Sequence, residues 1–182
     1  MLKDKEVRKI AQNIELIAFD VDGVLTDGNI TYTDDGNELK SFSVQDGLGL
    51  VMLLKAGIHV AVISSRTSHI VSTRMADLGV KHIYQGAGDK KQALEDLMGK
   101  LGIESESTAF VGDDLIDLPA MSIAGLSIAV ANAVSEVKSR ADWITETGGG
   151  KGGVREICDL VLEATGRQRQ LLKHYTGTSG KD

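Results

Sequence analysis

The fold of this chain is decided by the stretch FDVDGVLTDG, residues 19–28, which follows a mostly apolar run. That run predicts a buried strand, so Asp20 and Asp22 lie at its carboxyl end, where an open α/β sheet binds its ligand. Two carboxylates at this spacing can take separate roles in a phosphoryl transfer, because one can attack phosphorus while the other gives a proton to the leaving group. A calcium loop is the alternative for Asp-x-Asp-Gly, but it needs a glutamate at its twelfth position, where this chain has Thr31.

Strand-like and helix-like segments alternate along the rest of the chain. The apolar runs that predict strands are residues 15–19, 58–63, 80–84, 108–111, 126–130 and 143–145. The helix-like segments are residues 2–12, 48–56, 68–78, 90–101, 115–124, 135–140 and 153–164. This alternation predicts an α/β fold, a Rossmann-like parallel sheet with helices on both faces, as one domain over residues 1–182. The polar tail, about residues 167–182, is expected to be mobile.

One segment breaks the alternation. Residues 29–43 read as a short β-hairpin whose turn, residues 34–37, is rich in Asp, Gly and Asn. The hairpin lies between the first strand and the first crossover helix. It is too short to cover a ligand pocket alone, so we expect a neighbouring subunit to contribute.

Composition excludes several classes of protein. The chain has 182 residues, 42% of them hydrophobic, and a net charge of −6, which argues against a general nucleic-acid binder. No apolar stretch is long enough to span a bilayer. A single cysteine, Cys158, excludes an intrachain disulfide, and no secretory leader is evident. We therefore expect a cytoplasmic protein that does not bind membranes.

The Asp-Val-Asp-Gly pattern resembles the signature of the haloacid dehalogenase (HAD) phosphatases. In that family a strand-end hydroxyl and a lysine also contact the phosphoryl group, and Ser64 and Lys90 stand at the corresponding places. The Ser64 hydroxyl and the following amides can hold a transferring phosphoryl group, while Lys90 can neutralise its oxygens. Alone, Ser64 would suit a helix cap better than a phosphoryl ligand, and Lys90 with Lys91 would suit a solvated helix start; the spacing of Ser64 from the Asp pair favours the phosphoryl contact.

An acidic cluster, GDDLID at residues 112–117, follows the fourth predicted strand. If Asp113 and Asp117 converge on Asp20 and Asp22, each like-charge pair at about 4 Å costs roughly 4 kcal/mol at an effective dielectric near 20. A divalent cation offsets that cost, and Mg²⁺ suits a site made only of oxygen ligands. The sequence therefore predicts a magnesium site; the alternative is a solvated acidic loop.

A narrower resemblance covers residues 14–165. The hairpin and six short motifs resemble landmarks of the 3-deoxy-D-manno-octulosonate 8-phosphate (KDO 8-phosphate) phosphatases. These motifs are GVLTDG at 23–28, QDG at 45–47, Arg66, YQG at 84–86, GDDLID at 112–117 and GGKG at 149–152. The resemblance implies a Mg²⁺-dependent phosphoric monoester hydrolase of lipopolysaccharide precursor biosynthesis, with the hairpin in place of a cap domain. It also implies a homotetramer whose sites are completed by an adjacent subunit.

The same resemblance assigns roles to individual residues. Asp20 would be the nucleophile and a metal ligand, and Asp22 the general acid/base with its backbone carbonyl on the metal. Asp113 would be a further ligand, with Asp114 and Asp117 orienting the metal's waters. Besides Asp22, the implied substrate contacts are Ser43, Val44, Gln45, Asp46, Gly47, Arg66, Arg74 and Lys90. For Arg74 an exposed helix position is the alternative.

Three positions depart from the family pattern. Gln45 stands where some members have arginine, Ser65 where glycine is common, and Lys151 where arginine is common. Without the two parallel hydrogen bonds that an arginine makes to a carboxylate, the protein would bind the carboxylate of a sugar acid less tightly. A nine-carbon sugar-acid 9-phosphate therefore stays open as an alternative substrate. An alternative of another class is a phosphoacceptor receiver module, against which the hairpin and the Asp20/Asp22 pair argue.

Overall fold

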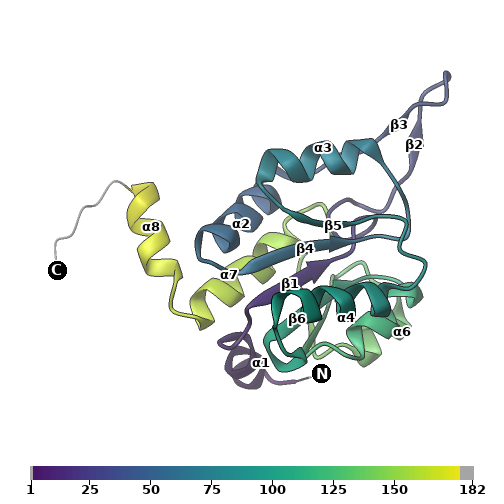
Figure 1. Ribbon diagram of the computed structural model, residues 1–182. Helices are drawn as coiled ribbons and strands as arrows, with labels where there is room; N and C mark the ends of the chain where they lie inside the picture. Colours follow the sequence, from purple (N-terminus) through teal and green to yellow (C-terminus); the bar gives the residue numbers. More distant parts are fainter. Residues whose placement is uncertain (1, 177–182) are drawn as a thin grey trace.

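The protein, described by a computed structural model over residues 2–176, is built on a six-stranded parallel sheet (Figure 1). In spatial order the strands are β5 (His82–Tyr84), β4 (His59–Ile63), β1 (Leu16–Phe19), β6 (Thr108–Gly112), β7 (Leu126–Ala129) and β8 (Trp143–Ile144). The predicted parallel α/β fold is therefore confirmed. Because β1 pairs with both β4 and β6, the carboxyl ends of these three strands meet at one edge.

Helices cover both faces of the sheet. They are α1 (Asp4–Ala11), α2 (Val44–Lys55), α3 (His69–Leu78), α4 (Lys90–Leu101), α5 (Leu118–Met121), α6 (Ser135–Arg140) and α7 (Gly153–Ala164). A further helix, α8 (Gln168–Thr176), contacts α7 and projects away from the sheet (Figure 1). α2 packs against α3 and α7 on one face, while α4 packs against α5 on the other. This sandwich accounts for the strands that are apolar throughout, since both of their faces are buried.

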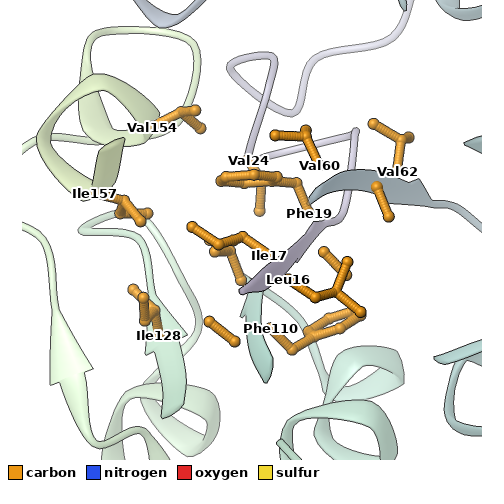
Figure 2. Packing of buried hydrophobic residues seen from close by; sticks show 14 of the residues in the cluster. Leu16, Ile17, Phe19, Val24, Val60, Val62, Phe110, Ile128, Val154 and Ile157 are labelled. Carbon is orange, nitrogen blue, oxygen red and sulfur yellow. The ribbon is translucent and has the colours of Figure 1, made fainter. Parts of the chain in front are cut away.

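The core is centred on β1, all four of whose residues are buried. Figure 2 shows its side chains among those of β4, β6, β7 and α7, including Val60, Val62, Phe110, Ile128, Val154 and Ile157. Burying one such side chain contributes about 1.5–3 kcal/mol relative to leaving it exposed. The strand that carries Asp20 is thus held rigidly from both sides.

The predicted hairpin is present as β2 (Thr31–Tyr32) and β3 (Glu38–Leu39), which pair antiparallel in a separate two-stranded sheet. It projects from the body of the protein between β1 and α2 (Figure 1). Tyr32 is 60% exposed and Leu39 is 52% exposed. The hairpin therefore presents apolar side chains to its surroundings.

Two predicted helices begin or end elsewhere in the structure. α2 starts at Val44, not near residue 48, because the Ser43 hydroxyl caps it by accepting a hydrogen bond from the Asp46 amide at 3.3 Å. Gly47 and Gly49 lower the helix propensity of this turn and obscured it in the sequence. The segment predicted as one helix over 115–124 is divided into a 3₁₀ turn at Leu115–Asp117 and the short helix α5.

The tail predicted to be mobile, about residues 167–182, is helical over much of the part that the structure describes, and its mobility stays a prediction. Gln168–Thr176 form α8, and Lys55 Nζ donates a hydrogen bond to the Tyr175 hydroxyl at 3.3 Å. The rest of that predicted segment, residues 177–182, lies outside the described part. Among residues 2–176, no helix combines the length and apolar character needed to cross a membrane.

Candidate active site

A buried ion cluster lies where β1, β6 and α4 meet. Lys90 Nζ lies 2.7 Å from Asp20 Oδ1 and 2.6 Å from Asp117 Oδ1. The side chains of Lys90, Asp20 and Asp117 are 1%, 6% and 0% exposed. Burial opposes the charged form of Lys90, but the two carboxylates outweigh it and raise its pKa. The fold thus pairs a fixed positive charge with Asp20.

Asp117 also shapes the loop that follows β6. Its Oδ2 accepts hydrogen bonds from the backbone amides of Asp113 at 2.9 Å and Asp114 at 3.2 Å. Gly112 is required beside it, because a Cβ at position 112 would lie 2.7 Å from Asp117 Cγ. Both oxygens of Asp117 are therefore engaged by protein donors, and the carboxylate of Asp114 accepts from the Leu115 amide at 2.7 Å.

Asp113 is the unsatisfied member of the cluster. Its Oδ1 is buried and has no hydrogen-bond partner among the described residues, and its carboxylate occupies the space that a Cβ at Gly23 would need. Burial and the charges of Asp117 and Asp20 raise the pKa of Asp113 to about 7. Burial and Asp117 likewise raise the pKa of Asp20 to about 6, despite the opposing effect of Lys90.

These carboxylates fit a hard divalent cation. Asp20, Asp113 and Asp117 each place an oxygen within 4.8 Å of the others. Since Asp117 is engaged elsewhere, the free oxygens come from Asp20 and Asp113. An orphaned buried carboxylate oxygen in a set of oxygen donors is what Mg²⁺ binding would satisfy.

A second cluster covers Asp22. Lys40, directly after β3, donates a hydrogen bond to Asp22 Oδ1, and Arg66 Nε lies 3.5 Å from Asp22 Oδ2. Glu38 Oε1 lies 2.7 Å from Arg66 Nη2 and 3.4 Å from Lys40 Nζ. Sequence reasoning missed Glu38 and Lys40. Their spacing of two in a strand, which places both on one face, was the available signal.

The loop over residues 20–28 is held in place by hydrogen bonds to the Asn132 side chain and to the Gly150 amide. Asn132 Nδ2 donates to the Gly23 carbonyl at 2.9 Å, and Asn132 Oδ1 accepts from the Gly149 amide at 2.6 Å. The Gly150 amide donates to the Val24 carbonyl at 3.0 Å. A Cβ at position 149 would lie 2.7 Å from that same carbonyl oxygen, so the glycines permit this close approach. Asn132 was missed because it carries no recognisable motif.

Comparison with known proteins places this geometry in a family. A family model described as haloacid dehalogenase-like hydrolase matches residues 61–157. A 3-deoxy-D-manno-octulosonate 8-phosphate phosphatase of Escherichia coli is 50% identical over 157 residues, covering 86% of this chain and 84% of its own. The chain belongs to the KDO 8-phosphate phosphatase family of haloacid dehalogenase-like hydrolases.

Solved structures agree with this membership. A 3-deoxy-D-manno-octulosonate 8-phosphate phosphatase from Moraxella catarrhalis, in complex with magnesium ion, phosphate ion and KDO, is 44% identical with a TM-score of 0.91. The match covers 94% of this chain and 98% of the other. A cobalt-bound phosphatase from Haemophilus influenzae is 48% identical with a TM-score of 0.83, covering 86% and 92%.

In this family member, the predicted phosphoryl ligands lie at the expected edge of the sheet. Ser64 follows β4, is 4% exposed, and accepts a hydrogen bond from the Arg66 amide at 3.2 Å. It does not cap α3, since Ser68 occupies the N-cap position. Lys90 opens α4, which Asp89 caps by accepting from the Gln92 amide at 3.1 Å.

The predicted substrate-binding loop, residues 43–47, is the start of α2. Val44 is 81% exposed, while Gly47 packs against Arg74, whose Nε is buried without a hydrogen-bond partner among the described residues. Asp46 is 2% exposed, and its carboxylate accepts from the Arg155 amide at 2.7 Å and the Gly152 amide at 3.3 Å. Its carboxylate is thus committed to the start of α7, and the substrate roles of all five residues, Asp46 included, stay predictions.

Replacing Asp46 with alanine is expected to destabilise this family member by about 1–3 kcal/mol, because two partly buried amides at the start of α7 lose their acceptor. Urea unfolding followed by circular dichroism measures the loss. Asp34→Ala, which removes an exposed carboxylate from the hairpin turn, is the control and is expected to change stability by less than about 0.5 kcal/mol. Equal stability of the two variants would contradict the assignment of Asp46 to α7.

Proposed function

We propose that this chain is a Mg²⁺-dependent phosphatase that hydrolyses KDO 8-phosphate to KDO and phosphate through an aspartyl-phosphate on Asp20. The observation that carries the proposal is the buried Asp20 carboxylate 2.7 Å from Lys90, beside the unsatisfied oxygen of Asp113 and two residues before Asp22. The relatives named for this activity, about half identical over most of the chain, support the substrate.

The reaction consists of two displacements at phosphorus, first by Asp20 and then by water, and side chains of this protein act in both. An Asp20 oxygen attacks phosphorus, the bond from phosphorus to the ester oxygen breaks, and Asp22 gives its proton to the departing alkoxide. Asp22 then takes a proton from water as that water attacks phosphorus and releases Asp20. Lys90 neutralises Asp20 and the phosphoryl oxygens, and the Ser64 hydroxyl donates to one of those oxygens.

Mg²⁺ would be held by Asp20, Asp113 and the backbone carbonyl of Asp22, with Asp114 and Asp117 orienting its waters. When bound, it supplies charge neutralisation to the transferring phosphoryl group. Asp117 also positions the Asp113 ligand, because it fixes the backbone of Asp113 and Asp114 through two hydrogen bonds.

We infer a homotetramer with sites shared between subunits, acting in the cytoplasm in lipopolysaccharide precursor synthesis. The exposed apolar residues of the hairpin region support an assembly role: Ile30, Tyr32 and Leu39 are 45%, 60% and 52% exposed. Arg66 and Arg74 would contact the sugar acid. Light scattering after size exclusion tests the assembly, and a fully active monomer would contradict the shared site.

The substrate is tested by steady-state phosphate release from KDO 8-phosphate, a nine-carbon sugar-acid 9-phosphate and hexose phosphates. The expected result is the highest kcat/KM for KDO 8-phosphate. Preference for the nine-carbon ester would instead fit Gln45 and Lys151, which lack the arginine fork of other members. Absence of turnover on every ester would overturn the proposal.

Removing divalent cations with a chelator is expected to abolish phosphate release, and adding Mg²⁺ is expected to raise the Tm. The physical reason is that a cation offsets the repulsion among Asp20, Asp113 and Asp117. At 100 times its Kd, a ligand of the folded state adds about 2.7 kcal/mol to stability. Thermal unfolding at matched ionic strength, with NaCl as the control salt, measures the shift. Full activity in chelator would contradict the metal site.

A further inference from the structure

The hairpin carries one buried cation that neither metal binding nor the phosphoryl contacts use. The Lys40 side chain is 1% exposed, although it follows a strand whose residues are partly exposed. Its ammonium donates to Asp22 Oδ1 and lies 3.4 Å from Glu38 Oε1. A buried ammonium is costly unless it is paired, so these two carboxylates are what keep Lys40 in place.

Glu38 anchors this arrangement to the body of the protein. Its Oε1 accepts from Arg66 Nη2 at 2.7 Å, and its Oε2 accepts from the Ser68 hydroxyl at 3.0 Å. Burial opposes ionisation of Glu38, yet the hydrogen bonds from Arg66 and Ser68 and the charge of Lys40 lower its pKa. The hairpin is therefore tied through Glu38 to the β4–α3 connection, and through Lys40 to Asp22.

The two oxygens of Asp22 stand in different surroundings. Oδ1 receives the hydrogen bond from Lys40, whereas Oδ2 lies 3.5 Å from Arg66 Nε, which is too long for a firm hydrogen bond. The Asp22 side chain is 19% exposed, so the carboxylate is mostly but not fully enclosed. Lys40 thus fixes one oxygen by a hydrogen bond, whereas Arg66 holds the other less firmly.

We propose that Lys40 is a positioning residue that holds the Asp22 carboxylate in the orientation that delivers its proton to the ester oxygen. This inference rests on the proposed phosphatase function. In the step it serves, the bond from phosphorus to the ester oxygen breaks, the electron pair stays on that oxygen, and the proton on Asp22 moves to it. The hairpin thereby takes part in leaving-group departure in addition to its proposed role in assembly.

The test uses esters whose leaving groups differ in their need for a proton. Glycerol 3-phosphate releases an alkoxide that must be protonated, while p-nitrophenyl phosphate releases a weakly basic phenolate. For Lys40→Met we expect kcat/KM to fall about 10- to 100-fold for glycerol 3-phosphate and KDO 8-phosphate, the range that a positioned acid contributes. For p-nitrophenyl phosphate we expect less than about a 3-fold loss, because kcat/KM reports the first phosphoryl transfer.

Three further variants separate positioning from damage to the fold. Lys40→Arg keeps the charge and is expected to restore part of the lost kcat/KM for the alkyl esters. Glu38→Gln keeps Lys40 but loosens its anchor, and is expected to give a smaller loss with the same dependence on the leaving group. Lys91→Met, at a 44% exposed side chain, is expected to match the wild type with all three esters.

Two outcomes would overturn the proposal. An equal loss with all three esters, in both Lys40→Met and Glu38→Gln, would mean that Lys40 supports the structure alone. A loss confined to KDO 8-phosphate would make Lys40 a ligand of the sugar acid. Failure of the wild type to hydrolyse any ester would instead overturn the proposed function, which the wild-type arm of the same assay detects.

Discussion

The Asp20→Asn variant is expected to release phosphate at least about 1,000-fold more slowly than the wild type, because an amide oxygen is a poor nucleophile toward phosphorus. The side chains are nearly isosteric, so the backbone around β1 is expected to stay in place. Lys90 keeps a buried carboxylate partner in Asp117, 2.6 Å away. The expected defect is therefore chemical, and steady-state phosphate release measures it.

The matched control for this variant lies in the same stretch of sequence. Asp27→Asn changes an exposed carboxylate that accepts from the Asn29 amide at 3.0 Å and touches none of the ion cluster. Its turnover is expected to equal that of the wild type. An Asp20→Asn protein that retained more than about a tenth of wild-type turnover would contradict the role of Asp20 as nucleophile.

Lys90→Met is expected to lower the free energy of unfolding by about 3–5 kcal/mol and to abolish turnover. Removing one partner of a buried ion cluster leaves the others uncompensated, here Asp20 and Asp117 at 6% and 0% exposure. Urea unfolding in the presence of chelator isolates this effect from cation binding. Added Mg²⁺ is expected to recover part of the stability, since it can replace the missing positive charge.

The neighbouring lysine is the control for that experiment. The Lys91 side chain is 44% exposed and lies 3.8 Å from Glu95, a pair that contributes little in water. Lys91→Met is expected to change stability by less than about 0.5 kcal/mol. If Lys90→Met cost less than about 1 kcal/mol, the charge pairing described for the ion cluster would be contradicted.

Local patterns were enough to predict the fold. The helix over residues 90–101 was predicted with its observed bounds, because Asp89 caps its start and Gly102 ends it at a φ of 66°. The strands were found because both of their faces are buried, which makes them continuous apolar runs. α2 was misplaced because two glycines in its first turns hide the helical pattern, although Gly49 is needed where its Cβ would lie 3.0 Å from Cys158.

The candidate site was only partly predictable. Asp20, Ser64 and Asp113 could be placed because each directly follows a parallel strand, and these strands end at one edge of the sheet. Lys90, at the start of α4, could be placed only together with the other motifs. The contacts of Asp46 with α7, more than 100 residues away along the chain, depend on tertiary packing that no local pattern encodes. Tertiary packing also determines the hydrogen bond from Asn132 to the Gly23 carbonyl, and the contacts of Lys40 with Asp22 and Glu38.

Rapid quenching of the enzyme with ³²P-labelled KDO 8-phosphate and Mg²⁺, followed by peptide mapping, tests most directly whether Asp20 carries the reaction. We expect a transient covalent label on the peptide that contains Asp20, formed and lost fast enough to account for turnover. Asp20→Asn is expected to show no label. Phosphate release at the full rate with no covalent label, or with the label on another residue, would contradict an aspartyl-phosphate mechanism at Asp20.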